Sequence, residues 1–229
     1  MENKGMDIGR SFGYMFQDKD WLVRILIGGL LSIVPILNFV VYGYMLQVIR
    51  NVAEGRELPL PTWDGFGEKF MKGLMLAIAS FIYSLPLIIL GVIVSIVIAI
   101  AGGASGSSRD SAGAAGGIAG ICMLVYYCVI FLYAVIVYGF VMWPGVMRYA
   151  ETGEFGVFFK FGENFGVAMS NLGGYIVMLL IIWLAGIVAS LVGLIACGVG
   201  VFFTSFWVIL VSGHLFGQYW AQFKLRQAA

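Results

Sequence analysis

Few residues in this sequence have the type and spacing that chemistry requires. His214 is the only histidine, and no carboxylate or second histidine stands three or four residues away to complete a metal site or a catalytic dyad. The cysteines Cys122, Cys128 and Cys197 lack C-x-x-C spacing, which favours apolar packing over metal ligation or a disulfide framework. The G-x-S-x-G, P-loop and H-E-x-x-H patterns are absent from the sequence. We therefore predict no catalytic residue, no metal ligand and no cofactor, and we expect a protein that is not an enzyme.

The long apolar segments also carry no acidic or basic residue. Ionisable groups inside a membrane usually mark ion pathways, because they are costly to keep there. Their absence disfavours proton-coupled or sodium-coupled transport. A site lined by backbone carbonyls, at a break near Pro35 or Pro86, is the alternative that this argument leaves open.

The composition is that of a membrane protein. Of 229 residues, 61% are apolar and only 11% are charged, and the mean hydropathy is +0.98, whereas roughly a quarter of residues are charged in ordinary soluble domains. The net charge of +1 argues against nucleic acid as a partner. Membrane lipids are the expected partners.

Four segments are long enough to cross a hydrocarbon core, which takes roughly 20 apolar residues in a helix. They are Gly73–Ala101, Ile118–Trp143, Leu172–Ala196 and Val199–Phe216. The first is longer than necessary and must tilt, project from the bilayer, or kink near Pro86.

The region Trp21–Ile49 is ambiguous because Pro35 lies in its middle. A single kinked helix would divide the thirteen Lys and Arg residues five against eight between the two sides. A break at Pro35 gives two short helices, Trp21–Val34 and Ile36–Ile49, and divides them twelve against one, with Arg109 as the exception. Each short helix spans only about 21 Å, so two crossings and a re-entrant hairpin are both open. We predict the hairpin.

The resulting architecture is an all-α, polytopic membrane protein of six membrane helices in three hairpins, each preceded by a short amphipathic interfacial helix. We predict one helical membrane domain over residues 1–229. Its parts are residues 6–55 (amphipathic helix and hairpin 1), 56–150 (link, amphipathic helix and hairpin 2), 151–222 (amphipathic helix and hairpin 3) and the tail 223–229.

The three amphipathic segments have aromatic or aliphatic residues at helical spacing. Their apolar faces are Ile8, Phe12, Met15 and Phe16; Phe66, Phe70 and Leu74; and Phe155, Phe158, Phe159 and Gly162. The stretch Arg50–Gly55 also resembles Arg148–Gly153, which indicates weak internal repetition.

The charge division predicts the orientation, because basic segments stay in the cytoplasm. The N-terminal segment Met1–Asp20 lacks the features of a cleaved signal peptide. We expect a multi-pass protein of the cell (cytoplasmic) membrane with both termini cytoplasmic. The outer connections would then be Pro35–Asn38, a flexible linker within Gly102–Gly117, and a tight turn at Cys197–Gly200.

Small residues are spaced to let helices approach closely. They are Gly28 and Gly29; Gly113, Gly116, Gly117 and Gly120; and Gly186, Ser190 and Gly193. We expect such faces to pack within the chain, and a homo-oligomer through Gly-rich helix faces is the alternative.

The most distinctive polar stretch is E-L-P-L-P-T-W-D-G-F-G-E-K-F-M-K-G-L, which follows G-Y-M-L-Q-V-I-R-N. Pro59 and Pro61 keep the chain extended, Trp63 is suited to a membrane interface, and Asp64 is suited to cap the next helix. With Gly43 and Gly73, these residues resemble the signature of the bacterial and archaeal membrane family catalogued as domain of unknown function 4013. The resemblance implies a multi-pass membrane protein but no activity and no ligand residues.

The function that we predict is that of a non-enzymatic membrane scaffold or lipid-organising protein. Cations near helix ends are the candidates for binding anionic lipid headgroups: Arg24, Lys72 and Arg148. The main alternative is a small-molecule or lipid transporter or channel with a path between the hairpins. A weaker alternative is an intramembrane enzyme acting on lipids.

Overall fold

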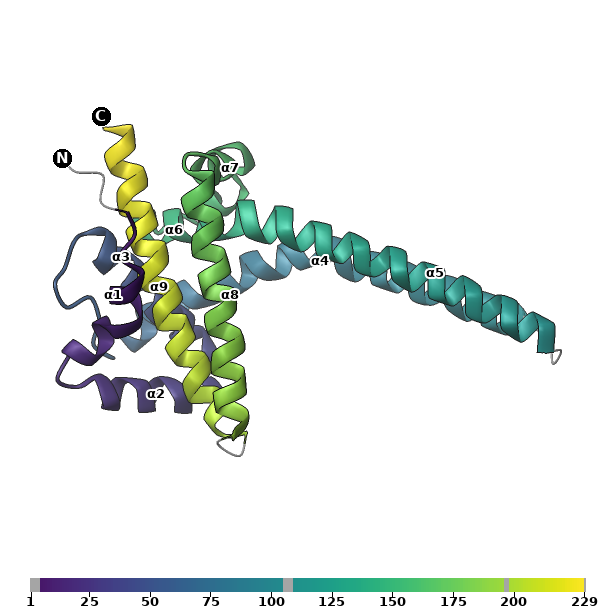
Figure 1. Cartoon of the computed structure of the whole chain (residues 1–229), viewed down its shortest axis with the longest axis horizontal. Coiled ribbons are helices and arrows are strands. Elements are labelled where there is room, and N and C mark those ends of the chain that lie inside the picture. Colours follow the sequence, from purple (N-terminus) through teal and green to yellow (C-terminus); the bar gives the residue numbers. More distant parts are fainter. Residues whose placement is uncertain (1–4, 105–108, 196–197, 229) are drawn as a thin grey trace. The chain divides into compact units, whose positions relative to one another are not determined.

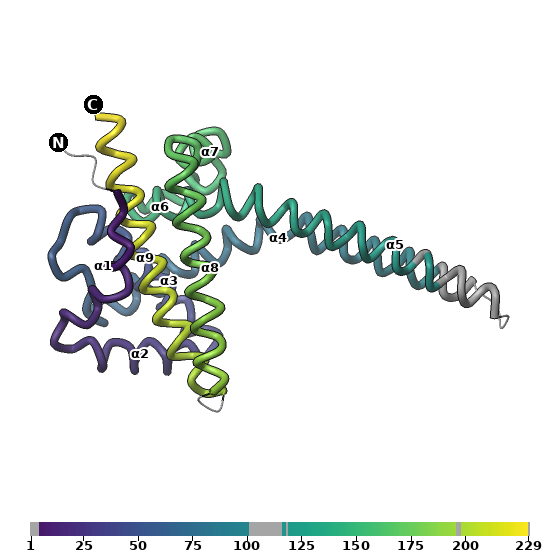
Figure 2. Tube along the Cα trace, in the orientation of Figure 1, coloured from purple at the N-terminus to yellow at the C-terminus, as the bar shows by residue number. Residues whose placement is uncertain are grey.

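A computed structural model describes residues 5–104, 109–195 and 198–228 of the chain (Figures 1 and 2). The described residues form helices joined by turns and short links, without a strand among them. They divide into two compact units, one of residues 1–78 and 141–229 and one of residues 79–140.

The helices follow one another in the order shown by the colours of Figure 1. Their bounds are α1 Ile8–Gly13, η1 Tyr14–Gln17, α2 Trp21–Ile33, α3 Asn38–Ala53, α4 Phe66–Ala104, α5 Arg109–Tyr133, η2 Ala134–Met142, α6 Trp143–Thr152, η3 Phe155–Phe159, α7 Phe161–Met169, α8 Leu172–Ile195 and α9 Gly200–Gln227. The segment η2 is a π-helix, and η1 and η3 are 3₁₀ helices.

Helix α3 is the centre of the first unit. Val40, Val41 and Tyr44 are fully buried, as are Val48 and Ile49. The helix packs most extensively on α9 and also contacts α2 and α6. Close packing of these apolar side chains supplies van der Waals contact that stabilises the unit.

Glycines bring α3 and the start of α4 into backbone contact. A methyl group added at Gly43 would overlap the carbonyl of Lys69, and one at Gly73 would overlap the carbonyl of Phe39. Two helices can approach this closely only where both surfaces lack side chains. These two glycines, which carry part of the family resemblance, therefore determine how α3 crosses α4.

Other predicted small-residue faces also pack within the chain. A methyl group at Gly28 or Gly29 of α2 would overlap the ring of Phe206 or Phe203 on α9. Gly193 of α8 lies equally close to Val201 in the α8–α9 hairpin. By contrast, Gly116, Gly117, Gly120 and Gly186 have no described neighbour near the position of an added methyl. The expectation of a homo-oligomer stays a prediction.

The predicted break at Pro35 is confirmed at the level of the helices. Helix α2 ends at Ile33 and α3 begins at Asn38, with a turn over residues 34–37. Among the described helices, α2 is apolar but shorter than a typical membrane span, and α3 is not one of the candidate spans. The structure therefore shows two helices here without showing two crossings.

The resemblance between Arg50–Gly55 and Arg148–Gly153 has a structural counterpart. Both stretches end a helix, α3 and α6, with a glycine at positive φ: 77° at Gly55 and 69° at Gly153. Glycine adopts this left-handed conformation at little cost, which makes it a common helix terminator.

The second unit is a long helical hairpin made by α4, from Ala79 onward, and α5 (Figure 2). The hydroxyl of Tyr133 donates to the carbonyl of Tyr83 at 2.6 Å, and that of Tyr138 donates to the carbonyl of Ser80 at 3.2 Å. Large apolar side chains elsewhere on the hairpin face outward; Phe131, for example, is 66% exposed. Such a surface suits a lipid environment and not water.

The structure changes three of the predicted boundaries. The amphipathic segment around Phe66 and Phe70 is not a separate helix, because α4 runs without interruption from Phe66 through Pro86. The predicted span Ile118–Trp143 passes from α-helix into the π-helix η2 at Ala134. Helices α4 and α5 also extend into the predicted linker, whose alanines favour helix. The tip of that linker, residues 105–108, lies outside the described residues.

The third amphipathic segment is also divided, because η3 ends at Phe159 and α7 begins at Phe161. The side chain of Asn164 explains the break. Its amide donates to the carbonyls of Val157 and Phe158 at 2.9 and 3.1 Å. A side chain that satisfies backbone carbonyls in this way competes with continuation of the helix.

We predict that Gly43→Ala and Gly73→Ala each lower the free energy of unfolding by at least about 2 kcal/mol, because overpacking at a backbone contact forces the helices apart. Thermal unfolding of the purified protein in detergent would measure the loss. Gly67→Ala is the matched control, since its added methyl meets open space on the same helix. Equal melting temperatures for all three variants would contradict the prediction.

Candidate functional site

The predicted interfacial signature, Pro59, Pro61, Trp63 and Asp64, lies in the link between α3 and α4. This link is packed against other parts of the chain. Pro59 and Pro61 are buried, and the carbonyl of Pro59 accepts a hydrogen bond from the Asn51 amide at 2.9 Å. The carbonyl of Pro61 accepts from the Tyr44 hydroxyl at 2.7 Å. Proline supplies no backbone donor, so these links are made through carbonyls. The segment is therefore fixed to α3.

Arg24 of α2 also binds this link. Its guanidinium donates to the carbonyls of Leu60 and Pro61 at 2.6 and 2.9 Å and pairs with Asp18 at 3.1 Å. The Arg24 side chain is only 13% exposed. Arg24, predicted to bind a lipid headgroup, instead donates its hydrogen bonds to acceptors within the chain.

Trp63 and Asp64 complete the link. The Trp63 ring lies 4.3 Å from that of Tyr44 and 5.9 Å from that of Phe206, measured between centroids. Asp64 is exposed, and its backbone carbonyl accepts a hydrogen bond from the buried Lys69 ammonium. Within the described structure, Trp63 thus packs on α3 and α9.

Lys72 lies at a small pocket of about 170 Å³. The lysine pairs with Glu68 at 2.7 Å. The two arginines of the same pocket, Arg50 and Arg56, both pair with Glu54 at 2.8 Å, and their hydrogen bonds, Arg50 first, hold the pKa of the Glu54 carboxyl below its usual value. Each cation around Lys72 is therefore already paired with a carboxylate, and Arg50 and Arg56 share one.

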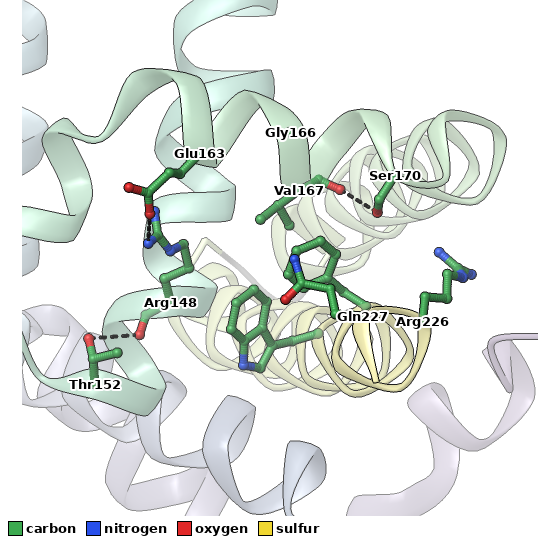
Figure 3. Close-up of a pocket in the computed structure, with 10 residues that line it drawn as sticks. Arg148, Thr152, Glu163, Gly166, Val167, Ser170, Arg226 and Gln227 are labelled. Carbon is green, nitrogen blue, oxygen red and sulfur yellow. Dashed lines mark hydrogen bonds and ion pairs between the residues drawn. The ribbon is translucent and has the colours of Figure 1, made fainter. Parts of the chain in front are cut away.

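Arg148 lies at a larger pocket, of about 680 Å³, between α6, α7 and α9 (Figure 3). We call it the α6–α7–α9 pocket. Its lining residues are Arg148, Thr152, Glu163, Gly166, Val167, Ser170, Trp220, Phe223, Arg226 and Gln227.

The lining combines two arginines with one carboxylate and two stacked aromatic rings. Arg148 pairs with Glu163 and donates to the Asn164 side chain at 2.9 Å. The rings of Trp220 and Phe223 stack with centroids 5.1 Å apart. Cationic and aromatic groups in one pocket are suited to an anionic group attached to a larger, partly apolar molecule.

A second polar cluster surrounds His214, but it is a structural contact. The His214 ring stacks on Tyr14, and its Nδ1 lies 2.9 Å from the Ser11 hydroxyl and 2.8 Å from the Gln218 amide. The Gln218 side chain also bonds the backbone N–H and carbonyl of Asp7 at 2.7 and 3.0 Å. This cluster attaches the start of the chain to α9.

Reasoning from the sequence selected Arg148 but missed Arg226, Glu163 and the two aromatic residues. The α9 residues Trp220, Phe223 and Gln227 are spaced by three and four, which places them on one helix face. That spacing was the available signal. The partner helix α7 could not be assigned from spacing alone.

Among the residues that the structure describes, four helices are long and apolar enough to cross a membrane: Phe66–Ile100, Ala119–Thr152, Leu172–Ile195 and Gly200–Gln227. Within the same residues, no group of three or more His, Cys, Asp or Glu side chains could hold a metal ion. The fold therefore defines an all-helical protein with the helices of a membrane protein.

The sequence matches the family described as "Protein of unknown function (DUF4013)" over residues 27–198, and the chain belongs to that family. This confirms the predicted resemblance. No curated protein and no solved structure matches the chain.

We predict that Arg24→Gln destabilises the protein by about 2–3 kcal/mol, because it leaves buried carbonyls and Asp18 without their partner. Lys72→Gln should change stability by less than about 1 kcal/mol, since the pair that it breaks is solvent-exposed. Denaturant titration in detergent compares the two variants. Similar small effects would mean that Arg24 does not hold the link in place.

Proposed function

We propose that this protein is a non-enzymatic membrane scaffold or lipid-organising protein that binds an anionic lipid headgroup in the α6–α7–α9 pocket. The observation that carries the proposal is a pocket of about 680 Å³ with Arg148 and Arg226 in its lining. It lies where α7 leads into the candidate span α8 and where the candidate span α9 ends (Figure 1).

The position of the pocket supports a lipid ligand. Helix ends next to apolar spans lie at the depth of headgroups, where Arg side chains and aromatic rings are favoured. Basic pockets between such helices are suited to lipid phosphates. Of the three cations that the sequence suggested, Arg148 lines this pocket, which is large enough for a headgroup, whereas Arg24 bonds backbone carbonyls and Lys72 pairs with Glu68.

The proposal includes a cell-membrane topology of three hairpins with both termini in the cytoplasm. The break between α2 and α3 supports the first hairpin. The distribution of Lys and Arg supports the orientation, with Arg109 alone among the thirteen on the outer side.

Thiol labelling tests this topology. In a background without native cysteines, Ser107→Cys should react in intact cells with a reagent that cannot cross membranes. Glu57→Cys, at an exposed position of the link, should react only after the cells are permeabilised. Labelling with the opposite pattern would exclude the proposed orientation.

A transporter or channel is the second candidate, and the π-helix η2 is the observation that favours it. Nine residues, Ala134–Met142, adopt this rare conformation within a candidate span. Such segments are frequently found at functional sites. Uptake of a solute by proteoliposomes, lost on deletion of one residue from η2, would support this candidate over the scaffold.

Removing the charge of the pocket tests headgroup binding. The double variant Arg148→Gln/Arg226→Gln should reduce co-purifying anionic lipid by at least about tenfold, because charge-assisted hydrogen bonds to phosphate are lost. Native mass spectrometry from lipid nanodiscs would report the bound lipid and the number of subunits together.

Arg50→Gln is the matched control, since it removes one cation that does not line this pocket. The proposal would fail if the double variant retained as much anionic lipid as this control.

A further inference from the structure

The two arginines of the α6–α7–α9 pocket differ in how their charges are matched. Arg148 is 15% exposed and donates from one guanidinium nitrogen to Asn164 at 2.9 Å and from another to Glu163. The buried Asn164 is itself fixed, because its amide nitrogen donates to two backbone carbonyls. Its oxygen must therefore face Arg148. The guanidinium is oriented by Asn164 and neutralised by Glu163.

Arg226 has no such complement. Its Nη1 atom is buried and makes no hydrogen bond with the described residues. Among the described residues, its Nη2 atom reaches only the Gln222 side chain, at a long 3.4 Å. A buried guanidinium nitrogen without an acceptor is costly, and a bound anion would supply the acceptor.

The arrangement of the side chains separates the two arginines. In Figure 3, Arg148 and Glu163 lie on one side of the pocket and Arg226 lies on the other, with Gln227 between them. The Gln227 side chain also lines the pocket and makes no hydrogen bond with other described residues. Its amide can therefore donate to a ligand at the Arg226 side.

We infer that a phosphate group binds at Arg226 and Gln227, and that Glu163 occupies a second anion position at Arg148, which only a ligand with two phosphate groups can take. This inference rests on the proposed function and specifies its ligand. Arg226 is then the primary contact, and Glu163 determines specificity.

Phosphate is the anion whose chemistry fits these groups. It offers several acceptor oxygens to a planar guanidinium and to an amide donor. A pocket of about 680 Å³ is far larger than an inorganic ion requires, so the phosphate is expected to be part of a larger molecule. A lipid headgroup and a free phosphate share this chemistry and must be separated by experiment.

Glu163 can act as a replaceable carboxylate because it is accessible. Its side chain is 58% exposed, and its other contact, with Lys160, is a loose 3.8 Å. Water reaches the Glu163 end of the pair and weakens it, so a phosphate can displace the carboxylate. A ligand with only one phosphate binds at Arg226, which lacks an acceptor, and leaves Glu163 paired with Arg148.

The first experiment measures lipid affinity by native mass spectrometry in phosphatidylcholine nanodiscs that contain either phosphatidic acid or cardiolipin. Arg226→Gln should weaken binding of phosphatidic acid, which has one phosphate, by at least about tenfold. Arg148→Gln should change it by less than about twofold, as should the control Arg50→Gln. An equal loss in Arg148→Gln and Arg226→Gln would overturn the assignment of the primary contact.

The second experiment tests Glu163. Glu163→Gln should strengthen binding of cardiolipin, which has two phosphates, by about fivefold and leave phosphatidic acid within about twofold. Glu154→Gln is the charge-matched control, because the Glu154 carboxylate makes no ion pair with a described residue. Equal strengthening of both lipids would show a general charge effect and would overturn the role given to Glu163. These variants retain both arginines and decide the matter even if Arg148→Gln fails to fold.

Inorganic phosphate and pyrophosphate, titrated into the detergent-solubilised protein by calorimetry, distinguish the source of the ligand. A lipid headgroup predicts no saturable heat below millimolar concentrations, and tight binding of either ion would replace the lipid with a free phosphate. If neither arginine variant changes retention of any lipid, the proposed function itself fails. If the double variant loses lipid but the single variants are equivalent, only this inference fails.

Discussion

The first unit depends on direct contact between the backbones of its helices. Glycines remove the side chains where α4 and α9 cross α3, which lets both helices approach α3 closely. In lipid there is little hydrophobic driving force between helices, so close van der Waals contact becomes a main source of cohesion. Gly43 and Gly73 provide that contact between α3 and α4, and a methyl group added at Gly217 of α9 would overlap Val52 and the carbonyl of Ile49 on α3.

Helix α9 links this packing to the candidate site. Gly213 and Gly217 pack against α3, and Trp220 and Phe223, further along the helix, line the α6–α7–α9 pocket. The indole of Trp220 donates to Glu151 of α6 at 2.5 Å, and Lys224 pairs with the same carboxylate at 2.8 Å. The pocket wall is therefore held by the same helix that completes the core, which favours a preformed site.

The sequence predicted the features that depend on local chemistry. The break beside Pro35 follows from backbone preferences, and the small-residue face at Gly28 and Gly29 follows from spacing. Features that depend on tertiary contacts were missed. Arg24 resembles an interfacial cation until the carbonyls of Leu60 and Pro61 are seen beside it.

The candidate site was accessible to sequence reasoning only in part. Arg148 was predicted because it lies near a helix end. Arg226 is a candidate because a buried nitrogen of its guanidinium lacks an acceptor, which only the three-dimensional structure reveals. The π-helix η2 has no proline or other signal that separates it from the preceding α-helix. The family match shows which family the chain belongs to but assigns it no activity.

The attachment of Asp7 to Gln218 restricts how the chain can be threaded. Hydrogen-bonded atoms 2.7 Å apart lie on the same side of a bilayer, so the number of crossings between residues 7 and 218 has even parity. Helices α4, α5, α8 and α9 contribute four if each crosses completely. Under that condition, with α9 crossing before residue 218, a single crossing by residues 21–49 would separate Asp7 from Gln218, so none or two crossings agree with this contact, as in the proposed hairpin.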